Sequence, residues 1–124
     1  MFDWVDYLVL ARRLGAGEAE ADQRTAISRA YYVAFHAARR HVARAHAEVA
    51  LPRHGAVHDV VWETLERGAR AERAAAHTGK RLRHKRTLAD YERVGLSFPN
   101  DTRQAIAWAE AVLQNLGAVA PPEP

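Results

Sequence analysis

Residues 18–49 read EAEADQRTAISRAYYVAFHAARRHVARAHAEV, and this stretch decides the fold. Its apolar residues recur at steps of three or four positions: Ile27, Tyr31, Ala34, Ala38 and Val42. That spacing places them on one face of an α-helix. Alanine favours helix, and the next proline, Pro52, ends it. The sequence therefore predicts a single long helix over residues 18–49.

The same periodicity extends over the rest of the chain. Four further helices are predicted, at residues 2–14, 55–70, 72–94 and 101–116. Gly15 stops the first of these, and Gly79 allows a break within residues 72–94. Asp101, followed three residues later by Gln104, has the pattern of a capping box at the start of the last helix.

These elements define the expected architecture. No segment has the alternating pattern of a strand. Five amphipathic helices with short connections predict an all-α fold, an up-and-down bundle of four or five helices. Residues 1–117 are expected to form one domain, because domains usually contain ~100–200 residues. Residues 118–124, rich in proline, are expected to be a disordered tail.

The composition excludes several kinds of site. The chain has 124 residues and no cysteine, which excludes disulfide bonds, thiolate zinc sites and a cysteine nucleophile. Absence of cysteine also fits a cytoplasmic location. No run of ~18 apolar residues is present, so no contact with a membrane interior is expected. Asp3 and Asp6 lie where a signal peptide would have basic residues.

Positive charge is concentrated in two runs. The formal net charge is +3 and the isoelectric point is about 9.7. Residues 39–46 read RRHVARAH, and residues 80–86 read KRLRHKR. Runs of this kind can contact phosphates or acidic partners, but a solvated helix face has the same composition.

The block SRAYYVAFH, residues 28–36, contains side chains suited to ligand binding. Arg29, Tyr32 and His36 are spaced i, i+3 and i+7, which places them on one helical face, and Arg40 continues the row. Together with Ser28, this row is suited to bind a phosphate and to stack a base. The alternative is a polar seam between helices, whose hydroxyl groups bond to neighbouring residues.

Two further pairs are spaced four residues apart. Arg86 and Asp90 can form an ion pair along a helix, which at a surface contributes ~0.3–0.5 kcal/mol. The arginine precedes the acid, which is the less favourable orientation and leaves Asp90 suited to another partner. His54 and His58 can both face a metal, but a zinc site needs further ligands. The sequence also lacks H-E-x-x-H and a glycine-rich phosphate loop, so no metal and no cofactor are predicted.

Four blocks of sequence follow one another in a familiar order: FDWVDYLVLARRL (2–14), AISRAYYVAFHAAR (26–39), RHGAVHDVV (53–61) and RTLADYE (86–92). In this order they resemble the HEPN domain, in particular the short, stand-alone HEPN proteins, over roughly residues 2–115. The second and fourth blocks are the most specific. The resemblance implies a helical up-and-down bundle that usually dimerises.

The resemblance also implies a function. HEPN proteins are often encoded beside a minimal nucleotidyltransferase, as toxin–antitoxin or defence pairs. Many are metal-independent ribonucleases whose motif is an Arg, a polar residue, and a His four to six residues after the Arg. Two copies meet across the dimer and form one composite cleft. Arg86 is similar to the motif arginine, and His54 matches a histidine that is common in this subgroup.

The ribonuclease motif is degenerate in this sequence, because Asp90 and Tyr91 take the place of its histidine. Imidazole, with a pKa of ~6.5, can act as both base and acid near neutral pH. A carboxylate or a phenol with its ordinary pKa does not do both. Arg86, Asp90 and Tyr91 are therefore the motif positions, with binding expected at Ser28, Arg29, Tyr32, His36, Arg40 and His54.

Two functions remain open at this point. The first is a non-hydrolytic component that binds a nucleotide or RNA and pairs with a nucleotidyltransferase. The second is a metal-independent endoribonuclease toxin, in which Arg86 steadies the phosphate while His36, His84 or Tyr91 handles protons. The chain is an enzyme only in the second case.

A homodimer is expected in both cases. Tyr31, Tyr32 and Phe35 are large aromatic residues on more than one side of the long helix. One helix face does not hide all three in a bundle of five helices, so a second subunit is predicted to cover part of this surface.

Overall fold

The computed structural model describes residues 1–118, which form five helices and, within that range, no strand. The helices are α1 (Asp6–Gly15), α2 (Glu20–Ala45), α3 (Val57–Glu66), α4 (Arg70–Tyr91) and α5 (Asn100–Asn115). The predicted all-α helical bundle is thus confirmed. Almost all of the predicted disordered tail lies outside the described residues. No helix in residues 1–118 is long and apolar enough to cross a membrane.

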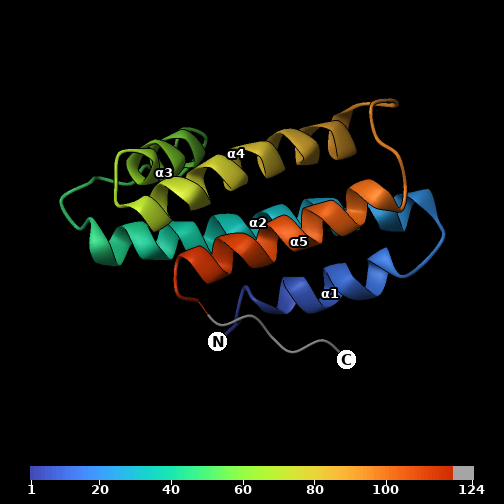
Figure 1. Ribbon diagram of the computed structural model, residues 1–124, viewed down its shortest axis with the longest axis horizontal. Coiled ribbons are helices and arrows are strands. Elements are labelled where there is room, and N and C mark those ends of the chain that lie inside the picture. The colour runs from blue at the N-terminus through green and yellow to red at the C-terminus, as the bar shows by residue number, and fades with distance from the viewer. Residues whose placement is uncertain (119–124) are drawn as a thin grey trace.

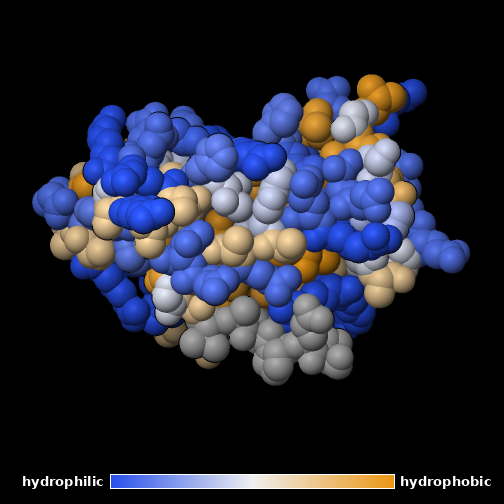
Figure 2. Space-filling view, in the orientation of Figure 1, coloured by the Kyte–Doolittle hydropathy of each residue, from blue (hydrophilic) through white to orange (hydrophobic). Residues whose placement is uncertain are grey.

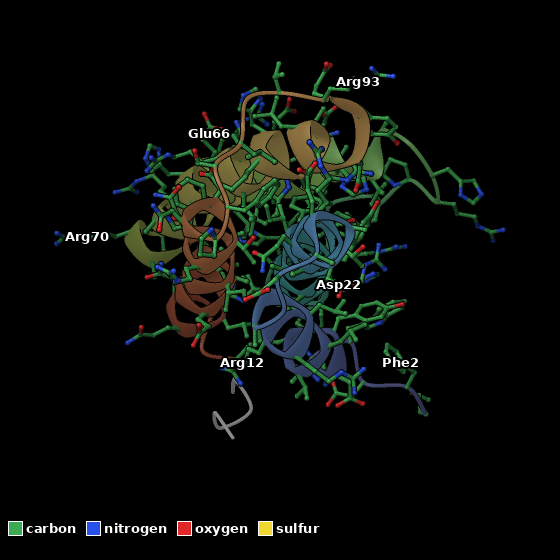
Figure 3. The ribbon with its side chains drawn as sticks, turned by 90° about the vertical axis from the view of Figure 1, so that its right-hand side faces the viewer. Phe2, Arg12, Asp22, Glu66, Arg70 and Arg93 are labelled. Carbon is green, nitrogen blue, oxygen red and sulfur yellow. The ribbon has the colours of Figure 1, made fainter. Side chains whose placement is uncertain are left out.

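Four helices lie along the long axis of the molecule and run in alternating directions: α1, α2, α4 and α5 (Figure 1). The short helix α3 packs against α2 and α4 at one end. Only α2 contacts all four other helices, so the stretch that decides the fold is also its centre. Seen from the end, the helices surround a filled interior, and Phe2, Arg70 and Arg93 point away from it (Figure 3).

The core is built from large side chains of every helix. The largest fully buried residues include Trp62, Tyr31, Leu8, Ile27, Leu82 and Leu113. Gly79 does not break α4, as its sequence position allowed, but lies buried within the helix. A Cβ atom at this position would lie 2.3 Å from a ring carbon of Trp62. Glycine at 79 therefore makes room for the largest residue of the core.

Tyr31 and Phe35 are buried within the single chain, with 0% and 3% of their surface exposed. Tyr32 is partly buried and packs against the same core. The bundle therefore buries Tyr31 and Phe35 without a second subunit, so these two residues do not support a homodimer, which stays a prediction. In contrast, Tyr91 and Val94, at and just after the end of α4, are 71% and 79% exposed.

Helices α2 and α4 end earlier than the sequence predicted. α2 stops at Ala45 instead of residue 49, because His46 leaves helical geometry with φ −129° and ψ 55°. α4 stops at Tyr91 instead of residue 94. The Arg24 guanidinium donates hydrogen bonds to the carbonyl groups of Leu88 and Ala89 in the last turn of α4, and to those of Glu92 and Arg93 just after it.

The N-terminal end of α1 and that of α5 also differ. α1 begins at Asp6, after a turn in which the Asp3 carboxylate accepts a hydrogen bond from the Val5 N–H (3.1 Å). α5 begins at Asn100, and no side chain caps it. The Asp101 carboxylate instead binds the Ser97 N–H (2.6 Å) and the Lys85 ammonium (2.5 Å), so the predicted capping box does not form.

Most of the visible surface is hydrophilic, with an apolar patch at the end that carries the connection between α4 and α5 (Figure 2). The basic run 80–86 is largely ion-paired. Arg83 binds Asp59 at 2.6 Å, and Lys80 binds Glu66. Lys85 binds Asp101, as described above. Most of this run is therefore a neutralised helix face.

Candidate functional site

The two most specific blocks of the sequence meet where α2 packs against α4. Ser28 and Tyr32 lie one turn apart on α2, and Arg86 and Asp90 lie one turn apart on α4. Together with Arg29 they form a group that we call the arginine–tyrosine cluster. All five residues were predicted from the sequence, on two segments far apart in the chain.

Two hydrogen bonds connect the two helices within this cluster, and an ion pair along α4 links the residues that make them. The Ser28 hydroxyl donates to Asp90 Oδ2 at 3.2 Å, and the same oxygen lies 3.0 Å from Arg86 Nε. The Arg86 guanidinium donates to the Tyr32 hydroxyl at 3.0 Å. Arg86 and Asp90 are 19% and 28% exposed, so the pair lies at the edge of the core. Asp90 therefore has a second partner across the helix contact, as the orientation of the pair suggested.

Both guanidinium groups of the cluster lie near the ring of Tyr32. The Arg29 guanidinium carbon is 4.9 Å from the centroid of that ring, and the Arg86 carbon is 5.4 Å from it. These distances are within the ~6 Å range of cation–π attraction. With one carboxylate for two guanidinium groups, the cluster keeps an excess positive charge. It is therefore suited to an anion.

Two further tyrosines border the cluster. Tyr7 of α1 lies 4.9 Å from the Arg29 guanidinium, and Tyr91 at the end of α4 lies 5.7 Å from that of Arg86. Tyr91 was a predicted motif position, whereas Tyr7 was not recognised. Tyr7 lies on α1, so no residue spacing within α2 relates it to residues 28–36. The exposed phenol ring of Tyr91 is available for stacking.

The other predicted ligand-binding residues lie outside the cluster. His36 stacks on Trp4, with ring centroids 3.6 Å apart. His36 and the exposed Arg40 line a cavity of about 350 Å³ between α2 and the chain ends. Burial, followed by the charge of Arg39, lowers the pKa of His36 to about 4. His54 is exposed in the connection between α2 and α3.

His58 was considered from the sequence as a metal ligand with His54 and was not among the predicted binding residues. Its Nδ1 lies 2.6 Å from the Tyr31 hydroxyl, and its ring stacks on Phe35 with centroids 3.9 Å apart. The Trp62 indole N–H donates to the same hydroxyl at 3.1 Å. Burial, and then the nearby guanidinium groups of Arg83 and Arg86, lower the pKa of His58. The ring is thus neutral at neutral pH.

The geometry defines an all-helical module with a cationic, tyrosine-lined contact between two helices. Scans against protein-family models, curated proteins and solved structures each found no match to this chain. The residues themselves therefore carry the functional argument.

Proposed function

We propose that this chain is a HEPN-like helical module that binds a nucleotide or RNA at the arginine–tyrosine cluster. In this proposal it is the non-hydrolytic component of a toxin–antitoxin or defence-type pair with a nucleotidyltransferase, and it works in the cytoplasm. The observation that carries the proposal is the position of Arg29 and Arg86, on two different helices, beside the ring of Tyr32.

The cluster has groups for both parts of a nucleotide, the phosphate and the base. Guanidinium groups bind phosphate oxygens through charge-assisted hydrogen bonds, and aromatic rings stack bases of any sequence. Asp90 and the Tyr32 hydroxyl fix the orientation of Arg86 before any ligand arrives. Less side-chain entropy is then lost on binding.

The pairing of Asp90 favours binding over hydrolysis. Its Oδ2 is engaged by Ser28 and Arg86, so the residue at the family's histidine position already has two partners. The alternative is a metal-independent ribonuclease with a composite site, and His58 supports it. The ring of His58 lies 6.2 Å from that of Tyr32, and a neutral imidazole is suited to act as a general base.

A homodimer is part of both proposals, the binding module and the ribonuclease. Its support is now the exposed apolar surface next to the cluster, at Tyr91 and Val94, instead of the buried aromatic residues of α2. A second copy seated there would bring two clusters together. Light scattering at high protein concentration tests this: a monomer mass alone would contradict it.

One set of measurements separates binding from hydrolysis. A labelled single-stranded RNA is titrated with the full chain in EDTA, and anisotropy and cleavage are recorded together. The proposal expects binding without cleavage, and at least tenfold weaker binding for Arg29→Gln and Arg86→Gln. Arg73→Gln is the matched control, roughly 20 Å away along α4 at 1.5 Å per residue.

The other outcomes decide against the proposal. Cleavage by the wild type that is lost in His58→Ala would establish the ribonuclease alternative. Equal affinities for the wild type and both cluster variants would show that the cluster is not the binding site.

A further inference from the structure

Three metal-ligating side chains converge where α2 ends and α4 begins. His41 Nε2 lies 2.8 Å from Glu72 Oε2, and His46 Nε2 lies 2.6 Å from the same oxygen. One ligand atom from each residue lies within 4.8 Å of the others. The group is separate from the arginine–tyrosine cluster, and the proposed function does not use it.

The backbone fixes this group of donors from both sides. The second carboxylate oxygen of Glu72 accepts a hydrogen bond from the Ala69 N–H at 2.8 Å, which orients the carboxylate at the start of α4. The backbone N–H of His46 donates to the Val42 carbonyl at 2.9 Å, at the residue where α2 ends. The three side chains are therefore positioned by two helix ends instead of by flexible loops.

The two histidine rings share one hydrogen-bond partner. Two imidazole rings direct Nε2 at a single carboxylate oxygen, so each neutral ring must carry its proton on that nitrogen. A divalent cation could take the place of the two Nε2 protons. Each neutral ring would then bind the cation through its Nε2 atom. Two histidines and a glutamate are a donor set that zinc uses in proteins.

We propose that His41, His46 and Glu72 bind one zinc ion. Zinc bonds to imidazole nitrogen and carboxylate oxygen are ~2.0–2.2 Å long, so tetrahedral donors are roughly 3.3 Å apart. The two nitrogen-to-oxygen distances therefore need to lengthen by about 0.5–0.7 Å, which side-chain rotations supply. The side chains of His41 and His46 are 27% and 23% exposed, so the site lies near the surface.

The ion, held by three protein ligands, would cross-link two helix ends. It would join the end of α2 to the start of α4 and so close the intervening segment, which contains α3. Closing a loop of this kind stabilises the folded chain at the expense of unfolded conformations. The sequence did not reveal the site because His41 and His46 are five residues apart. They converge only because α2 ends at Ala45 and His46 adopts non-helical angles.

The test uses the full chain without a histidine tag, dialysed first against EDTA and then against buffer with zinc chloride. We expect one zinc ion per chain by mass spectrometry. At zinc concentrations about 100 times Kd, Tm should rise by on the order of 10 °C. His41→Ala and His46→Ala should each weaken zinc binding at least tenfold. His84→Ala, on an exposed residue roughly 18 Å further along α4, should bind like the wild type.

A second variant protects the test against misfolding. Glu72→Gln keeps an oxygen for the Ala69 N–H but removes the carboxylate charge, and it should also lose zinc while circular dichroism shows the wild-type helix content. Two results would overturn the proposal. One is a wild-type chain that binds no stoichiometric zinc, and the other is equal zinc affinity in the wild type and all three ligand variants.

Discussion

Arg86 on α4 donates a hydrogen bond to the hydroxyl of Tyr32 on α2, with 3.0 Å between the two atoms. This contact joins two segments that are 54 residues apart in the chain. It places the charge of Arg86 beside the aromatic ring that Arg29 also approaches. Helix packing and the proposed binding site thus depend on the same side chain.

Arg86→Lys should weaken RNA binding about tenfold, or roughly 1.4 kcal/mol, although the charge is kept. Lysine is a point charge and does not reproduce the planar fork that reaches Tyr32 and Asp90 together. Anisotropy titrations at two salt concentrations measure the effect, with Arg73→Lys as control. Unchanged affinity in Arg86→Lys would mean that charge alone matters at this position.

The sequence predicted the helical class, because that class depends on local periodicity. Arg29, Tyr32 and Arg86 could be assigned to helix faces by counting residues. Which faces meet is also constrained when each helix has one apolar stripe. The ligand role of these residues is still a prediction.

The remaining contacts depend on tertiary packing and have no local signal. Tyr7 reaches Arg29 from a different helix, and the pairing of His58 with Tyr31 requires α3 to lie beside α2. Helix ends were misplaced for the same reason. The end of α4 is set by Arg24, which lies far away in the sequence, and no propensity of residues 91–94 indicates it.

Arg24→Ala should lower the free energy of unfolding by about 2 kcal/mol, because hydrogen bonds from a charged group contribute ~1.5–3 kcal/mol and those of Arg24 are part-buried or exposed. The guanidinium binds several carbonyls where α4 ends, at the negative end of its dipole. Urea denaturation measures the change. Glu20→Ala is the control, since it removes only the exposed ion pair of Arg24 and should cost about 0.5 kcal/mol or less. Equal effects of the two substitutions would contradict this role of Arg24.

Gly79→Ala should destabilise the chain by about 1–3 kcal/mol, even though alanine is the better helix former by ~1 kcal/mol. The added Cβ would lie 2.3 Å from the ring of Trp62, which is 1% exposed and packed in the core, so the ring or the helix has to shift. Thermal unfolding followed by circular dichroism measures the loss. Thr78→Ala, at the neighbouring position, should change stability by less than about 0.5 kcal/mol. A Gly79→Ala chain that is more stable than the wild type would show that the Trp62 ring can shift.

Protonation of His36 should destabilise the fold as the pH falls from 6.5 to 4. Burial lowers the pKa of His36 from 6.5 to about 4 in the folded chain, where the ring stacks on Trp4. Between these pH values the unfolded chain binds a proton that the folded chain does not. Stability is therefore complete above pH 6.5 and decreases toward pH 4.

The size of the effect follows from the shift and from the exposure of the ring. A pKa shift of this size corresponds to roughly 3 kcal/mol in the free energy of unfolding. Because the ring is only half-buried, screening by water reduces this contribution to about 1–2 kcal/mol. His36→Gln has no group that titrates in this range. Urea denaturation at pH 7 and pH 4.5 should therefore show that the wild type loses about 1 kcal/mol more stability than the variant. Equal losses in both proteins would mean that His36 protonates as readily in the folded chain as in the unfolded one, and that Trp4 does not shield it.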